Sequence, residues 1–155
     1  METKFTPYSA TERVYLRRLY KELPYEVEYS PIEKYDHWDA KYLNTDLNKW
    51  VIVEAKVRTS LYTNEAGGFI IEKDKFLWLK EIQQEYLDKG LNVQILYMNF
   101  VEGYNTVYYY DLTDMTKDDM IKTYMPRKKY TAKESDYKKE PAYMFDTEYK
   151  IKQIK

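Results

Sequence analysis

The stretch KYDHWDAKYL-NTDLN-KWVIVEAKVR, residues 34–58, decides the fold. Its two arms have the polarity pattern of strands and the polar NTDLN between them is typical of a turn, so the stretch predicts an antiparallel hairpin. The apolar residues 50–53 predict that the second arm is a buried central strand. Residues two apart in a strand share a face, so Glu54, Lys56 and Arg58 should point the same way. Charges so close to a buried strand are costly unless they pair with one another or with a metal ion.

An aspartate on the first arm, Asp39, followed by Glu-x-Lys at the end of an apolar strand, Glu54 and Lys56, resembles the core motif of the PD-(D/E)xK, or restriction-endonuclease-like, nuclease superfamily. The resemblance covers residues 9–112, in which a helix with a glutamate, the hairpin, an amphipathic helix and a further apolar strand follow in the family's order. It implies an α/β fold with a restriction-endonuclease-like αβββαβ core, in which helices flank a mixed central sheet. Trp38 stands where the family pattern has a proline, so Asp36 stays open as the alternative first acid.

The resemblance also implies an activity, the metal-dependent hydrolysis of phosphodiester bonds. Asp39, Glu54 and the main-chain carbonyl of Ala55 would hold one or two Mg²⁺ or Mn²⁺ ions, and Lys56 would orient the attacking water or neutralise the transition state. Acidic neighbours should keep the pKa of Lys56 high. DNA is the expected substrate rather than RNA, and an endonuclease is expected because no domain for threading a strand is visible. Cutting both strands of a duplex would call for a homodimer, since one site cuts one strand.

Glu12 has two interpretations. The residues SATE at 9–12 match a capping box, which predicts that Glu12 folds back onto the Ser9 amide at the start of a helix that Pro24 ends. The family resemblance instead implies that a glutamate on the first helix approaches the metal site. Between these two, the sequence favours the cap. Arg13 is expected on the solvated side of the same helix.

Composition limits the chemistry that the chain can perform. The 155 residues include no cysteine and one histidine, which excludes thiolate chemistry and leaves zinc clusters or serine-type triads poorly supplied. Carboxylates remain, and they suit hard cations such as Mg²⁺ or Mn²⁺. No signal peptide or apolar run of membrane-spanning length is visible, so we expect a cytoplasmic protein without membrane contact, folded as one domain.

After the hairpin, the pattern predicts a polar loop over residues 59–68, a helix over 74–89 that Gly90 ends, and strands over 93–101 and 106–110. Residues 113–155 are expected to form an irregular C-terminal extension with a short helix within 114–125. The extension has a formal net charge of +3, whereas residues 1–112 have a formal net charge of −4. A basic, aromatic stretch after Pro126 is the best candidate for contacts with phosphates outside the core. The candidate nucleic-acid-binding residues are Arg58, Arg127, Lys128 and Lys129.

Three further hypotheses compete with the nuclease. The hairpin could be an ordinary strand end in which Asp39 pairs with Lys56. The chain could be a nuclease-like module without catalytic activity that binds nucleic acid or a protein as a regulator, inhibitor or assembly component. It could also be a structural interaction protein, to which its 19 tyrosines would contribute. Tyrosines can stack on bases, but a half-buried strand position is the commoner place for them.

Overall fold

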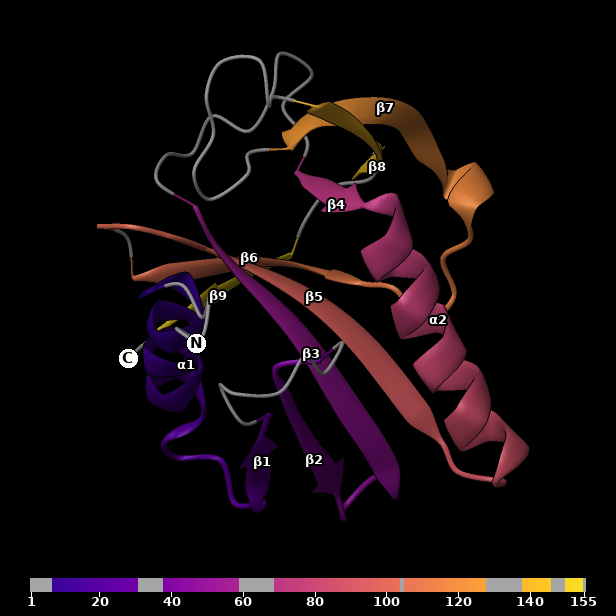
Figure 1. Cartoon of the computed structure of the whole chain (residues 1–155). Helices are drawn as coiled ribbons and strands as arrows, with labels where there is room; N and C mark the ends of the chain where they lie inside the picture. The colour runs from indigo at the N-terminus through magenta and orange to yellow at the C-terminus, as the bar shows by residue number, and fades with distance from the viewer. Residues whose placement is uncertain are drawn as a thin grey trace, which may run out of the picture.

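A computed structural model describes residues 7–30, 38–58, 69–103, 105–127, 138–145 and 150–154. Its centre is a six-stranded sheet, in which β3 and β5 are parallel and every other neighbouring pair is antiparallel (Figure 1). The α/β class with a mixed sheet is therefore confirmed. Across the sheet the strands are β1 (Val27–Tyr29), β2 (Ala40–Asn44), β3 (Lys49–Arg58), β5 (Val93–Val101), β6 (Thr106–Asp111) and β9 (Lys150–Gln153).

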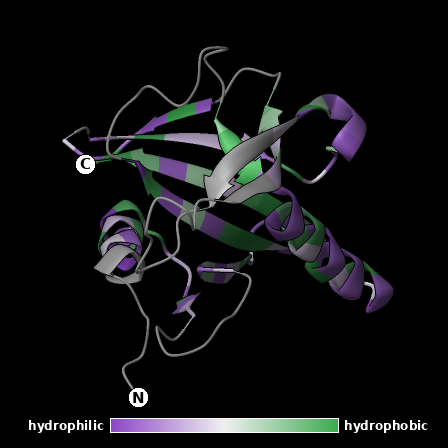
Figure 2. Cartoon of the chain, turned by 45° about the horizontal axis from the view of Figure 1, so that its top comes forward, coloured by the Kyte–Doolittle hydropathy of each residue, from purple (hydrophilic) through white to green (hydrophobic). Residues whose placement is uncertain are grey.

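The two helices cover opposite faces of this sheet. Helix α1 (Pro7–Tyr20) packs Leu16 and Tyr20 onto the face made by alternate residues of β3 and β5 such as Val53. Helix α2 (Lys73–Asp88) packs Phe76 and Leu79 onto the other face. Figure 2 shows hydrophilic and hydrophobic residues alternating along α2, as expected for a helix with one buried side. Neither helix is both long and apolar enough to cross a membrane among the residues described.

The predicted irregular extension is wrong for the described part of the C-terminal region. A second sheet has the order β4-β8-β7, formed by β4 (Ile70–Glu72), β8 (Lys138–Phe145) and β7 (Met120–Arg127). The helix predicted within 114–125 is also wrong, since only a 3₁₀ turn, η1 (Lys117–Asp119), forms there and is capped by Thr116. Eight consecutive residues of β7 pair with β8, and this tertiary pairing overrides a weak local preference for helix.

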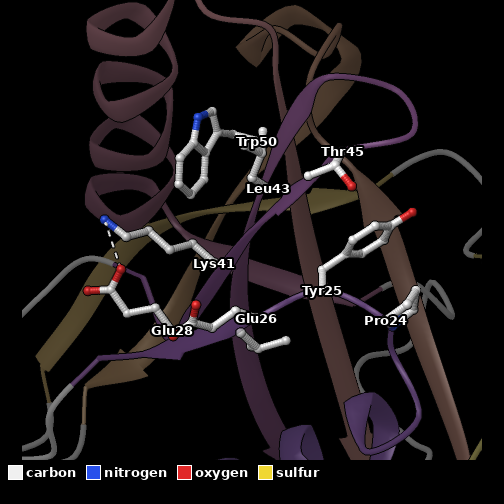
Figure 3. A pocket seen from close by; sticks show the side chains of 9 residues that line it. Pro24, Tyr25, Glu26, Glu28, Lys41, Leu43, Thr45 and Trp50 are labelled. Atoms are coloured by element: carbon white, nitrogen blue, oxygen red, sulfur yellow. Dashed lines mark ion pairs between the residues drawn. The ribbon is translucent and has the colours of Figure 1, made fainter.

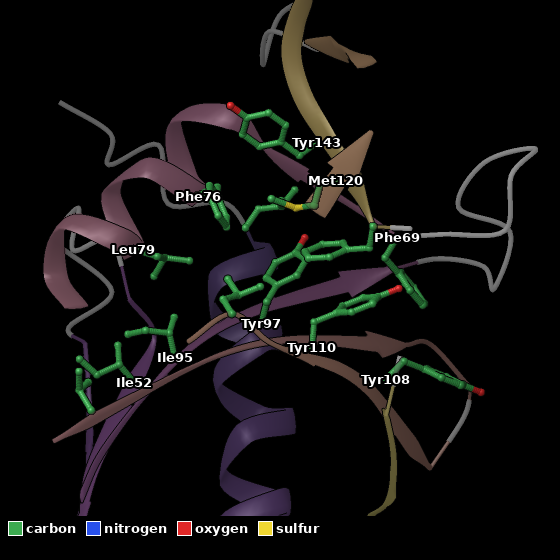
Figure 4. Packing of buried hydrophobic residues seen from close by; sticks show 14 of the residues in the cluster. Ile52, Phe69, Phe76, Leu79, Ile95, Tyr97, Tyr108, Tyr110, Met120 and Tyr143 are labelled. Atoms are coloured by element: carbon green, nitrogen blue, oxygen red, sulfur yellow. The ribbon is translucent and has the colours of Figure 1, made fainter. Parts of the chain in front are cut away.

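Aromatic side chains join the second sheet to the first (Figure 4). Phe145 of β8 stacks on Tyr110 of β6 with ring centroids 3.9 Å apart, and Tyr143 meets Phe76 of α2 edge to face. Tyr97 of β5 is fully buried in the same cluster. Tyr143 and Phe145 thus anchor β8 against the core, and Tyr97, Tyr110 and Tyr143 serve as core residues.

The connection between α2 and β5 follows the prediction closely. The helix ends at Asp88, and Gly90 has the positive φ of 74° that ends helices readily because glycine has no Cβ. Leu87, near the end of this helix, is 47% exposed. Gln83 is buried instead and donates a hydrogen bond to the carbonyl of Thr113. After the turn at Gly90 the chain returns as β5, which lies parallel to β3 in the middle of the sheet.

Candidate active site

The hairpin brings Asp39 to the side of Glu54. Ala40 pairs with Val53 in the antiparallel register, so Asp39, one residue earlier, lies next to Glu54 at the end of the ladder. The amide of Asp39 donates to the carbonyl of Val53 at 2.7 Å, and Oδ2 of Asp39 accepts the amide hydrogen of Ala55 at 2.7 Å. The register of the hairpin therefore places the side chains of Asp39 and Glu54 next to each other.

Arg13 holds the other oxygen of Asp39, contrary to the prediction that it is solvated. Its Nη1 donates to Oδ1 of Asp39 at 2.7 Å, while Nη2 and Nε donate to the carbonyl of Ser30 at 2.8 and 3.1 Å. Arg13 is only 5% exposed. It lies three and seven residues before Leu16 and Tyr20, the buried residues of α1, and this helical spacing places it on the inward face. The planar guanidinium thus fixes Asp39 between α1 and the start of β2.

Glu54 is buried at 4% exposure and pairs with a lysine from α2. Nζ of Lys75 lies 3.3 Å from Oε1 of Glu54, and the Lys75 side chain is 16% exposed. Lys75 lies one turn before the buried Leu79 and so adjoins the sheet. Burial raises the pKa of Glu54 well above its ordinary value, and the nearby charge of Asp39 raises it further against the opposing effect of Lys75.

Lys56, two residues beyond Glu54, is on the same face of β3. Its Nζ lies 3.5 Å from Oε1 of Glu72, the residue that ends β4 and precedes α2. Burial lowers the pKa of Lys56, but Glu54 and Glu72 outweigh it, and the net effect is a raised pKa. The expectation that Lys56 stays protonated is borne out by this environment. Its partner is Glu72, so the hypothesis of a plain Asp39–Lys56 pair does not describe the site.

Glu12 approaches the site rather than capping its helix. Because α1 begins at Pro7, Ser9 lies inside the helix and cannot be the N-cap residue, so the capping-box prediction is wrong. Burial and the charge of Asp39 raise the pKa of Glu12 from 4.5 to about 7. Lys56 and other neighbouring cations oppose this rise, which places Glu12 within their electrostatic reach.

Together these residues form what we call the charged cluster, at the end of β3, to which α1 and the first turn of α2 contribute side chains. It has four carboxyl groups and three basic groups. Its members are Glu12, Arg13, Asp39, Glu54, Lys56, Glu72 and Lys75.

The donor set of the charged cluster fits a hard divalent cation in its chemistry. The carboxylates of the cluster raise one another's pKa because their negative charges repel, and a bound cation would relieve this repulsion. The amide of Ala55 faces Asp39, and the carbonyl of a strand residue points to the same side as its amide, so a main-chain oxygen is directed there too. Within the described ranges, no three acidic or histidine side chains form a ready metal cage. Arg13 and Lys75 occupy the carboxylates in this conformation.

Of the residues predicted to contact nucleic acid, the structure describes the side chain of Arg58. Arg58 is committed internally, since it donates to Oδ1 of Asn99, the hydroxyl of Tyr97 and the carbonyl of Ile70. This geometry ties β3 to β4 and does not favour a contact with phosphate. Arg127 is the last residue of β7, and its side chain lies outside the part of the chain that the structure describes. The remaining predicted features lie outside the described residues, namely Lys128 and Lys129, Asp36 and the loop 59–68.

A hollow of about 720 Å³ opens on the outer part of the sheet, between β1, β2 and the start of β3 (Figure 3). Its lining includes Glu26, Glu28, Lys41 and Trp50, and Nζ of Lys41 lies 3.7 Å from Oε2 of Glu28. Two carboxylates against one ammonium do not make a site for a phosphate. None of the described members of the charged cluster lines this hollow, which is therefore separate from the candidate active site.

Sequence reasoning missed three members of the charged cluster. Arg13 and Lys75 could have been found from their helical spacing to buried leucines, whereas Glu72 depends on β4, a three-residue strand that pairs only with a distant segment of the chain. The cluster therefore contains Asp39, Glu54 and Lys56 as expected, together with two partners that helical spacing could have indicated and one, Glu72, that no local pattern indicates. The sequence matches no protein-family model, and no curated protein matches it either.

Proposed function

We propose that the chain is a divalent-metal-dependent nuclease of the PD-(D/E)xK type, which hydrolyses phosphodiester bonds in DNA. The observation that carries the proposal is the placement of Asp39 beside Glu54 and Lys56 at the end of the buried strand β3. Asp39 and Glu54 are almost fully buried there, whereas the side chain of Lys56 keeps 32% exposure. Acids held inside and a lysine whose side chain is partly exposed suit a site that meets a polyanion from solvent.

The order of the elements supports a restriction-endonuclease-like core. In the described chain α1 precedes β1, β2 and β3, and α2 then leads to β5, which lies parallel to β3. This is the αβββαβ order, with the short β4 added before α2. The helices flank the mixed sheet on opposite faces. The site lies at the carboxyl end of the central strand pair, a usual place for sites in α/β folds.

The residues that would hold Mg²⁺ or Mn²⁺ are Asp39, Glu54 and the carbonyl of Ala55, with Glu12 as an additional carboxylate. When bound, such a cation supplies Lewis-acid stabilisation of charge at phosphorus and a more acidic water. Arg13 keeps Asp39 in place through a buried, hydrogen-bonded ion pair. Asp39 in turn accepts the Ala55 amide hydrogen, so the two arms of the hairpin keep the acids in register.

Lys56 acts as a cation and hydrogen-bond donor in this proposal. Its raised pKa keeps the proton on Nζ, so it would stabilise the charge that develops on the phosphate or orient the water, and it would not serve as a general base. Glu72 holds the ammonium group near the exposed end of the site. Glu12, with a pKa of about 7, would take up or release a proton close to neutral pH.

A second candidate is a nuclease-like module that binds nucleic acid or a protein without cutting it. The observation in its favour is that cations of the chain already neutralise the two buried acids, Arg13 on Asp39 and Lys75 on Glu54. In such a module the charged cluster would serve only to hold the hairpin and the helices together.

Incubation of the purified protein with supercoiled plasmid, single-stranded DNA and RNA separates these candidates. The nuclease proposal predicts cleavage of DNA in Mg²⁺ or Mn²⁺ and none in the presence of a chelator. Cleavage of RNA alone would change the substrate class. Intact polymers in every condition, with binding detected by a mobility shift, would favour the module that binds without cutting.

A further inference from the structure

Lys75 is the residue of the charged cluster that the motif does not account for. It comes from the first turn of α2, and its ammonium group contacts Glu54 at 3.3 Å. The contact is well shielded from solvent, with side-chain exposures of 16% and 5%. Lys75 also acts electrostatically on Glu12, so it stands among the acids rather than at the rim.

The position of Lys75 conflicts with a metal ion at Glu54. Two cations that share one buried carboxylate repel each other strongly, because water does not screen charges there as it does at the surface. Lysine can relieve the conflict since its charge is at the end of a flexible four-carbon stem. In this same position Nζ also lies over the ring of Trp78, 5.9 Å from the ring centroid. Trp78 is 38% exposed, so an outward movement of the ammonium group along this ring reaches solvent.

We propose that Lys75 is an internal counter-ion of Glu54, which neutralises this carboxylate in the metal-free protein and leaves it when a divalent cation binds. The inference rests on the proposed function, since it takes Glu54 as a metal ligand. Lys75 keeps the buried acid compensated while the site is empty of metal. The exchange weakens metal binding, because each bound cation must displace the ammonium group.

Titration calorimetry with Mn²⁺ as the probe tests the exchange without any measurement of activity. Lys75→Met keeps most of the side-chain length and removes the charge, so we expect Mn²⁺ to bind at least about tenfold more tightly than to the wild type, a difference of about 1.4 kcal/mol. The matched control is Lys73→Met, which removes the same charge from an exposed position in the same turn of α2. Its Mn²⁺ affinity should stay within about twofold, since solvent screens exposed charges. Thermal melting confirms that each variant is folded, and Lys75→Gln replaces Lys75→Met if that variant is not.

The outcomes separate the inference from the proposed function. Tighter binding by the Lys75 variant alone supports the exchange. Unchanged or weaker Mn²⁺ binding by the Lys75 variant overturns the exchange. In that case, loss of Mn²⁺ binding in Glu54→Gln would still support Glu54 as a metal ligand. An equal gain in Mn²⁺ affinity in Lys73→Met would mean that the effect comes from the lower net positive charge alone, and it would overturn the specific role of Lys75. No Mn²⁺ binding by the wild type or by the Lys75 variant would overturn both proposals.

Discussion

Replacing Arg13 by methionine should destabilise the metal-free protein by about 3–5 kcal/mol, the usual cost of removing one partner from a buried ion pair. The substitution leaves the Asp39 carboxylate at 8% exposure without its cation. It also removes two donors from the carbonyl of Ser30. Asp39 keeps the amide hydrogen of Ala55, which limits the loss.

Urea denaturation in chelator, followed by circular dichroism, measures this cost. For a domain of this size, 3–5 kcal/mol corresponds to a fall of about 6–20 °C in melting temperature. The matched control is Arg17→Met, on the exposed side of α1, where the guanidinium lies over the Tyr29 ring. This variant should lose less than about 1 kcal/mol of stability. Asp39→Asn combined with Arg13→Met should cost less than the sum of the single variants, because each removes the same interaction. A loss under about 1 kcal/mol for Arg13→Met, or strict additivity, would refute the view that this pair holds the hairpin.

Three other predictions concern the core, the pH dependence and the metal. Phe145→Ala should cost about 3–5 kcal/mol in urea denaturation because its ring is buried against the core, whereas Ile151→Ala, 58% exposed, should cost no more than about 0.5 kcal/mol; equal small losses would contradict the integration of β8. The folded pKa of Glu12 is raised from 4.5 to about 7, so its stabilising contribution is complete below pH 4.5 and is lost as the pH rises through about 7; melting in chelator from about pH 5 to 8 should therefore vary less in Glu12→Gln, and parallel curves would count against the burial of this acid. Mn²⁺ at about 100 times its dissociation constant should stabilise the wild type by about 2.7 kcal/mol; an equal gain in Glu54→Gln would exclude that residue as a ligand.

The central hairpin could be predicted because its signals are local. Apolar residues from 51 to 53 and a polar turn specify two strands and their register, and the register brings Asp39 to Glu54 without further information. The strand over residues 93–101 and the end of α2 at Gly90 have equally local causes.

The C-terminal strands and the partners of the acids could not be predicted in this way. β7 is stable because it pairs with β8, and β8 because it pairs with β4, about 70 residues earlier in the chain. The contacts Lys56–Glu72 and Glu54–Lys75 depend on that arrangement, since β4 positions the start of α2 over β3. Arg13 was misassigned for a different reason: a charged residue on a helix is usually solvated, and only a specific buried partner reverses this rule.

The most direct test of the nuclease proposal compares cleavage with metal binding in the same variants. We predict that the wild type binds Mn²⁺ and cleaves DNA, that Glu54→Gln loses both, and that Lys56→Met binds Mn²⁺ but no longer cleaves. Lys49→Met, at the other end of β3, should cleave like the wild type. Undiminished cleavage by Lys56→Met, or a wild type that binds Mn²⁺ and cuts neither DNA nor RNA, would contradict a phosphodiesterase site at the end of β3.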